Sequence, residues 1–304
     1  MIGKTNAIVG KGGDNEVLVA LMNRTIQTMN VPKEVTKIGD YSFYNCKELQ
    51  SITIHDNVTS IGNSAFYDCK GLQSIAIPDG VIEIGHFTFS GCEYMTGDIV
   101  IPDSVTFIGN GAFERCQRIE AVYINDLMTS IGGYAFRMCH RLEKAHLPIN
   151  LTDIPGDTFR GCNSLTDVNI PSSVKTMGAF CFDSTKIPEA IIPSGVTALP
   201  VRVFASSTSL HTVYIPKSII TIDNTAFFSC SGLTNVTIED GFNGNGLNLS
   251  ASTKYSVETI LSWLEALADR TGLTTYTLTI GATNLAKLSS EQIAIATAKN
   301  WTLA

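Results

Sequence analysis

Residues 77–100 read IPDGVIEIGHFTFSGCEYMTGDIV, and residues 101–124, IPDSVTFIGNGAFERCQRIEAVYI, repeat the same pattern. Each stretch begins with Ile-Pro, has Ile-Gly seven residues later, and carries a phenylalanine at its thirteenth position, Phe89 or Phe113. These phenylalanines, which we call the ladder phenylalanines, recur at spacings of 22 to 24 residues: Phe43, Phe66, Phe89, Phe113, Phe136, Phe159, Phe182, Phe204 and Phe227. A fixed short period of this kind predicts a β-rich repeat solenoid, in which each repeat forms one coil and packs on the next.

Three further columns of apolar residues keep register with the ladder phenylalanines. An aliphatic residue or methionine precedes each ladder phenylalanine by five and by eight positions, as Ile84 and Val81 precede Phe89. Another usually follows it by six positions, and alternation from there onward indicates a short strand with one buried face. A glycine commonly follows the first column, as Gly85 follows Ile84, where we expect a turn that needs no Cβ. All these positions are therefore predicted to form the interior.

The consensus I-P-x-x-V-x-x-I-G-x-x-A-F-x-x-C-x-x-L-x-x-V closely resembles the BspA-like leucine-rich-repeat family over residues 26–240. The resemblance implies a leucine-rich-repeat right-handed β solenoid of about nine 23-residue units. Members of that family are typically bacterial surface proteins implicated in attachment to host proteins and cells, and relatives occur in phage genomes. The resemblance, and not the spacing, supplies this expectation of function.

The two ends of the chain depart from the repeat, and a solenoid needs a cap at each end. Residues 1–25 lack the ladder phenylalanine and are predicted to be a Gly-rich lead and N-terminal cap. Residues 241–304 are predicted to be an α/β C-terminal cap, in which Ser256 begins a helix and 275–280 form a strand. Ser289 with Gln292 makes a capping box for a second helix. A separate docking module is the alternative for this tail.

Composition narrows the classes of partner. The net charge of −7 is spread along the chain without a run of Lys or Arg, which argues against nucleic acid. No stretch approaches the ~20 apolar residues of a membrane span, so we expect no membrane insertion. The first residues lack the apolar core of a signal peptide. We expect a location on a bacterial cell surface or in a phage virion, and a cytoplasmic location stays open.

Cysteine recurs three residues after most of the ladder phenylalanines: Cys46, Cys69, Cys92, Cys116, Cys139, Cys162 and Cys230. Because Thr185 and Ser207 fill the same column, we interpret these cysteines as free structural thiols, with disulfides or metal as the alternative. Cys181 occupies a small-residue site and is also predicted to pack. No paired Cys or His motif and no recurring nucleophile or carboxylate arrangement is present. We therefore expect no metal, no cofactor and no catalytic residue.

The register also predicts which side chains stand outward on the concave strand face. One residue per unit gives this column: Thr53, Ala76, Val100, Tyr123, His146, Asn169, Ile191, Tyr214 and Thr237. Aromatic groups among charges favour protein recognition. We predict a ligand-binding site formed by Tyr123, His146, Ile191, Tyr214, His211, Arg118 and Arg141. Such residues also simply favour strands, so another face, a loop or no specific site are alternatives.

The sequence thus predicts a non-catalytic binding or adhesion protein. Its expected partner is a host or cell-envelope protein or glycan on a cell surface, and a receptor-binding component of a phage tail is one form of this role. The alternative is an intracellular protein-protein interaction scaffold that uses the same face. The oligomeric state does not follow from the sequence.

Overall fold

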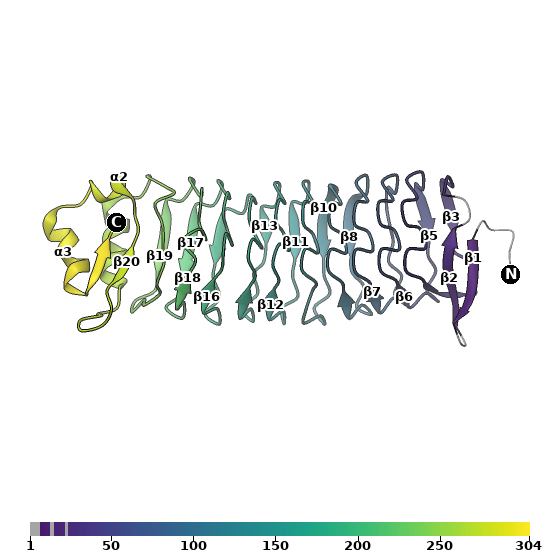
Figure 1. Cartoon of the computed structure of the whole chain (residues 1–304), viewed down its shortest axis with the longest axis horizontal. Helices are drawn as coiled ribbons and strands as arrows, with labels where there is room; N and C mark the ends of the chain where they lie inside the picture. Colours follow the sequence, from purple (N-terminus) through teal and green to yellow (C-terminus); the bar gives the residue numbers. More distant parts are fainter. Residues whose placement is uncertain (1–6, 13–14, 22–23) are drawn as a thin grey trace. The chain divides into compact units, whose positions relative to one another are not determined.

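The computed structural model describes residues 7–12, 15–21 and 24–304. The chain divides into two compact units. The first unit comprises Met1–Leu151 and Asp157–Asn169, and the second comprises Thr152–Gly156 and Ile170–Ala304. Each unit is a parallel β solenoid, in which every coil of about 23 residues places its short strands beside those of the next coil (Figure 1).

The first unit contains three sheets. The largest has the order β1-β2-β4-β6-β7-β9, with β1 antiparallel to β2 and the other pairs parallel. Its strands are β1 (Ala7–Gly12), β2 (Asn15–Leu21), β4 (Val35–Ile38), β6 (Ser60–Ile61), β7 (Glu83–Ile84) and β9 (Phe107–Ile108). A parallel sheet of order β13-β11-β10-β8 contains β8 (Thr96–Val100), β10 (Arg118–Tyr123), β11 (Lys144–His146) and β13 (Asp167–Val168). Strand β3 (Thr28–Asn30) pairs with β5 (Ser51–Thr53).

The second unit repeats this arrangement with its own strands. A three-stranded parallel sheet has the order β15-β17-β19 and contains β15 (Glu189–Ile191), β17 (Thr212–Ile215) and β19 (Asn235–Ile238). Two further parallel pairs are β12 (Asp153–Ile154) with β14 (Thr176–Met177), and β16 (Ala198–Leu199) with β18 (Thr221–Ile222). The strands are short because each coil must turn several times within about 23 residues.

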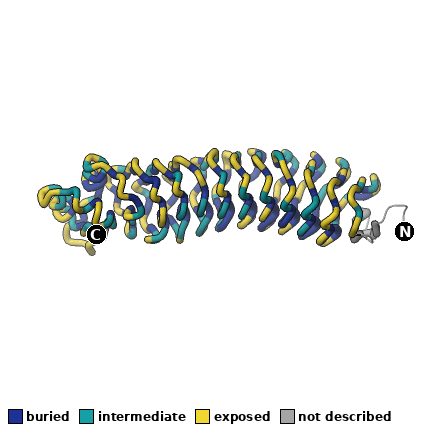
Figure 2. Tube along the Cα trace, turned by 90° about the horizontal axis from the view of Figure 1, so that it is seen from above, coloured by how far each residue is buried: buried dark blue, intermediate teal, exposed yellow. Residues whose placement is uncertain are grey.

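The ladder phenylalanines form the interior of the coils, as predicted. All nine are buried. From Phe43 to Phe159 and from Phe182 to Phe227 the neighbouring rings stack almost in parallel, from 4.7 Å between the centroids of Phe43 and Phe66 to 5.8 Å between those of Phe204 and Phe227. Figure 2 shows the buried positions recurring in every coil. A single coil could not bury such a ring alone, so each one depends on its neighbours.

The cysteine column has a structural role that confirms the predicted free thiols. All eight cysteines are free and buried. In the column, each thiol from Cys69 onward donates to the carbonyl of the ladder phenylalanine one coil earlier, as Cys69 Sγ does to Phe43 O at 3.0 Å. At the positions without cysteine, the Thr185 and Ser207 hydroxyls both donate to Phe182 O at 3.1 Å. The column therefore selects a small side chain with a donor.

The glycines that follow the first apolar column have a different role from the one expected. Gly62, Gly85 and Gly109 do not have the positive φ of a tight turn. Instead, a Cβ at Gly109 would lie 2.5 Å from His86 N and 2.6 Å from the carbonyl carbon of Gly85. These glycines allow the backbones of successive coils to approach closely.

The N-terminal range predicted as lead and cap contains the β1–β2 hairpin, in which Gly12 pairs with Asn15. Strand β2 continues the sheet, since Glu16 pairs with Val35 of β4. Residues 1–6, 13–14 and 22–23 of that range lie outside the described residues.

The C-terminal range contains both predicted helices. Helix α1 (Val257–Ala266) begins after Ser256, whose hydroxyl accepts the Thr259 N–H, and it ends earlier than the predicted limit near Gly272. Helix α3 (Ser290–Ala298) begins with the predicted capping box. The short α2 (Ala282–Leu285) and the pairing of β20 (Tyr276–Leu278) with β21 (Trp301–Leu303) were not predicted. Coil stacking also continues beyond the last ladder phenylalanine, since Asn245 bridges to Thr221.

Candidate binding surfaces

The outward side of β8, β10 and β11 carries the first part of the predicted site. The register pairs Val100 with Tyr123 and Tyr123 with His146, so these three side chains stand in one row, as the sequence predicted. Val100 is 61% exposed, and Tyr123 and His146 are partly exposed. An apolar and an aromatic side chain therefore face solvent from three hydrogen-bonded strands, which hold them at fixed spacing.

Charged side chains surround this row. His146 Nε2 lies 3.6 Å from Asp126 Oδ1, and Lys144 Nζ lies 3.2 Å from Asp167 Oδ2. The Asp167 carboxylate raises the pKa of Lys144 above its ordinary value. The predicted Arg118 places its guanidinium 4.5 Å from the centroid of the Tyr94 ring, which is a cation–π contact.

Two other outward residues predicted in the first unit, Arg141 and Asn169, make different contacts. Arg141 is exposed three residues before β11, and its backbone N–H donates to Gln117 O at 3.1 Å. Asn169 is exposed, as predicted, and it also bonds the backbone of Leu147: its Oδ1 accepts the Leu147 N–H at 2.8 Å and its Nδ2 donates to Leu147 O at 2.9 Å. The Asn169 side-chain amide thus makes the pair of hydrogen bonds to Leu147 that a neighbouring strand's backbone would otherwise make, and it extends the pairing of β11 with β13.

The second unit carries the rest of the predicted site on β15, β17 and β19. Ile191 pairs with Tyr214, and Tyr214 pairs with Thr237, so the predicted row is present here too. Ile191 is 59% exposed, and the His211 side chain is exposed just before β17. Partial burial and the neighbouring Glu239 carboxylate raise the pKa of the Tyr214 phenol. The seven predicted residues thus form two groups, Arg118, Tyr123, Arg141 and His146 in the first unit and Ile191, His211 and Tyr214 in the second.

Sequence reasoning missed a ladder of polar side chains in the first unit. Asp40 Oδ1 accepts the Asn63 N–H at 2.6 Å, and Asn63 Oδ1 accepts the His86 N–H at 2.8 Å. His86 Nδ1 then accepts the Asn110 N–H, and Asn110 Oδ1 accepts the Gly133 N–H, both at 2.9 Å. We call Asp40, Asn63, His86 and Asn110 the polar ladder. Its sequence signal is a polar residue directly after the glycine in four successive units, after Gly39, Gly62, Gly85 and Gly109.

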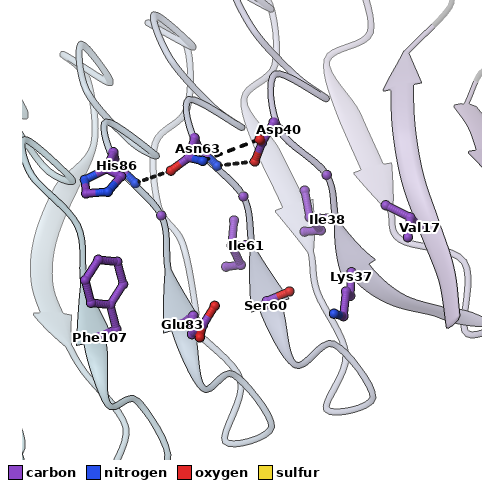
Figure 3. Close-up of a pocket in the computed structure, with 13 residues that line it drawn as sticks. Val17, Lys37, Ile38, Asp40, Ser60, Ile61, Asn63, Glu83, His86 and Phe107 are labelled. Atoms are coloured by element: carbon purple, nitrogen blue, oxygen red, sulfur yellow. Dashed lines mark hydrogen bonds between the residues drawn. The ribbon is translucent and has the colours of Figure 1, made fainter. Parts of the chain in front are cut away.

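Asp40, Asn63 and His86 of the polar ladder form one side of a shallow groove of about 390 Å³ (Figure 3). The other side is a strand column in which Lys37, Ser60, Glu83 and Phe107 pair in order. Backbone glycines lie between the two rows: Gly39, Gly62 and Gly85. Polar groups thus line both sides of an open groove, and the 41% exposed Phe107 stands at one end.

Sequence comparison decides the family. The family model for the BspA type leucine rich repeat region matches residues 19–143 and 129–249, with six copies. The chain belongs to this family. The BspA-type repeat accounts for the ladder phenylalanines and the cysteine column, and proteins with this repeat are typically non-catalytic. No curated protein matches the chain significantly.

Solved structures of other repeat proteins resemble this BspA-type chain in fold. A leucine-rich cell surface protein of Faecalibacterium prausnitzii is 22% identical, with a TM-score of 0.60, over 100% of this chain and 94% of that one. A leucine-rich-repeat protein of T. pallidum is 27% identical, with a TM-score of 0.57, over 60% and 88%. One from Bacteroides ovatus is 21% identical, with a TM-score of 0.52, over 100% and 99%.

Two further findings concern the described part of the BspA-type chain. Among residues 7–12, 15–21 and 24–304, no three His, Cys, Asp or Glu side chains are grouped in a way that could hold a metal ion. None of the helices described has both the length and the apolar character needed to cross a membrane.

Proposed function

We propose that the chain is a non-catalytic recognition protein that binds a protein partner through the outward strand rows. The rows are Val100, Tyr123 and His146 in the first unit, and Ile191 and Tyr214 in the second. The single observation that carries the proposal is the exposed, hydrogen-bonded row around Tyr123. Tyrosine on a rigid strand offers a large contact area at little cost in side-chain entropy, which is why it is common where proteins bind.

The charged neighbours support specificity for a protein partner. Arg118 is held over Tyr94, and Asp126 lies beside His146, so both signs of charge border the apolar row. Interfaces of this composition pair an aromatic centre with a polar rim. In the second unit, the exposed His211 directly precedes β17, the strand that carries Tyr214.

The setting that we propose is the outer surface of a cell or a virus particle. The family membership and the name of the F. prausnitzii protein, a cell surface protein, support an adhesin on a bacterial surface. A receptor-binding component of a phage tail is the other form of this role, since both need a rigid, repetitive binding face.

Binding of the labelled intact protein to bacterial and human epithelial cells tests the proposal. We expect binding that is lost when the cells are first treated with protease, and that falls strongly in the Tyr123→Ala/Tyr214→Ala double variant. The matched control is Ile82→Ala/Ile220→Ala, which removes one exposed aliphatic side chain from each unit on the other strand column. If both double variants keep wild-type thermal stability and bind the cells equally well, the strand rows are not the binding site.

A further inference from the structure

A second surface of the first unit lies on the turns that carry the ladder phenylalanines. In this unit, the residue two positions before each ladder phenylalanine has a left-handed backbone, with φ between 51° and 61°. In chain order these residues are Tyr41, Ser64, Phe87, Gly111, Tyr134 and Asp157. Aromatic and small residues therefore alternate from coil to coil. We call Tyr41, Phe87 and Tyr134 the aromatic row.

Contact between coils explains why a glycine follows Phe87 at this position of the next coil. A Cβ at Gly111 would overlap the Cδ1 and Cε1 atoms of Phe87, so the Phe87 ring lies across the backbone of the next coil. A second large side chain at Gly111 would occupy the same space. Since neighbouring strands lie 4.7–4.9 Å apart, one ring in every two coils gives a spacing of about 9.5 Å.

The three rings make local contacts, Tyr41 with Tyr44, Phe87 with Gly111 and Tyr134 with Arg137, but the turn of the coil does not require an aromatic residue at this position. A left-handed backbone favours glycine, asparagine or aspartate, and bulky residues rarely adopt it. The rings are also exposed, at 59% for Tyr41, 37% for Phe87 and 40% for Tyr134. Exposed apolar groups that recur along one face are typical of binding surfaces.

The polar ladder runs beside the aromatic row, because Asp40 precedes Tyr41 and His86 precedes Phe87 in the chain. His86 Nδ1 accepts the Asn110 N–H, so the ring proton of a neutral His86 is on Nε2, which can donate outward. Carboxylate, amide and hydroxyl groups of Asp40, Asn63 and Ser60 line the same groove (Figure 3). Both signs of charge occur there, from Lys37 and Glu83.

We propose that the aromatic row and the adjoining groove bind a neutral, extended, β-1,4-linked polysaccharide. In such a chain, every second sugar presents the same face. Two sugar residues span about the same length as the spacing of neighbouring aromatic side chains in the aromatic row. Aromatic faces stack on the C–H faces of sugars, while planar polar side chains such as those of Asn63 and His86 bond sugar hydroxyls. The mixed charge of the groove fits a neutral ligand better than an anionic one.

Calorimetric titration of the whole protein with cellohexaose and chitohexaose tests this proposal, with maltohexaose as the control of different linkage. We expect measurable binding of at least one β-1,4-linked hexasaccharide and at least tenfold weaker binding of maltohexaose, whose chain curves away from a straight row. This comparison needs no variant. Absence of binding, or equal affinity for the two linkages, would overturn the proposal.

Variants locate the site. Each of Tyr41→Ala, Phe87→Ala and Tyr134→Ala should weaken cellohexaose or chitohexaose binding about tenfold, while their far-ultraviolet circular dichroism stays that of the wild type. Phe228→Ala, which removes a 54% exposed ring outside the row, is the matched control and should bind normally. Analytical sedimentation of the wild type and of the triple variant tests whether a second copy of this chain, instead of a polysaccharide, binds the aromatic row. A wild-type dimer that dissociates in the triple variant would assign the row to a second copy of this chain and overturn the proposal.

Discussion

The ring of Phe87 lies across the backbone of Gly111 in the following coil, at a place where a Cβ would overlap two ring carbons. Gly111→Ala should therefore destabilise the protein in two ways, by its left-handed φ of 61° and by displacing the ring. Gly97→Ala is the matched control, since Gly97 also has a positive φ but nothing lies within 4 Å of its added Cβ. We expect about 1–2 kcal/mol for Gly97→Ala and a larger loss for Gly111→Ala, measured by urea denaturation. Equal losses would show that the contact is unimportant.

The buried thiols should be inert in the folded protein. Burial raises the pKa of Cys162 and Cys230 to about 12, so almost no thiolate exists at pH 8. We expect no rapid reaction of the native protein with a thiol reagent and eight reactive thiols after denaturation without reductant. A smaller count in the denatured protein would indicate disulfides and contradict the free-thiol column.

The Trp263 side chain links helix α1 to the last strand of the second unit, through a hydrogen bond of 2.6 Å from its Nε1 to Val236 O. Trp263→Phe keeps most of the apolar volume and should cost about 1 kcal/mol for the lost bond. Trp263→Ala also leaves a cavity and should cost about 3–5 kcal/mol. Hydrogen exchange at β19 amides checks the position of the effect, and unchanged protection in Trp263→Ala would mean that α1 does not cover this strand.

Glu239 should make the stability of the second unit depend on pH. Its Oε2 accepts the Lys217 N–H at 3.0 Å, and this bond lowers the pKa of Glu239. A folded-state pKa below the unfolded one stabilises the protein above the ordinary glutamate range, and the contribution is lost as pH falls through the lowered value. Glu239→Gln should flatten this acid dependence in thermal denaturation between pH 5 and 3. An identical profile for both proteins would contradict it.

The interior was predictable because each coil packs on a neighbouring coil with the same sequence pattern, so equivalent residues lie next to one another. Once Phe89 and Phe113 are aligned, the positions of Cys92, Cys116 and the outward Tyr123 follow without further information. The same logic fails where the repeat ends, since the β1–β2 hairpin and the pairing of β20 with β21 depend on contacts that occur once. The repeat also does not predict individual side-chain hydrogen bonds, such as those from the exposed Asn169 to the Leu147 backbone.

Of the candidate sites, one could be predicted from the repeat and two needed the structure. The row of Val100, Tyr123 and His146 was predictable from the period of the strand alone. The aromatic row is visible in the sequence as an alternation, but the contact between the Phe87 ring and the Gly111 backbone is revealed only by coil-to-coil geometry. The polar ladder likewise needs the direction of each side chain, as in the bond from His86 N to Asn63 Oδ1.

The alternation of the aromatic row constrains how such a gene can lengthen. Since a coil bonds mainly to the coils before and after it, recombination that duplicates one 23-residue unit would leave the interior intact. Duplicating the unit of Phe87 alone, however, would bring two rings onto adjacent coils, where one would occupy the space that Gly111 now leaves open. Units must therefore be gained or lost in pairs if the spacing of the rings is to be inherited.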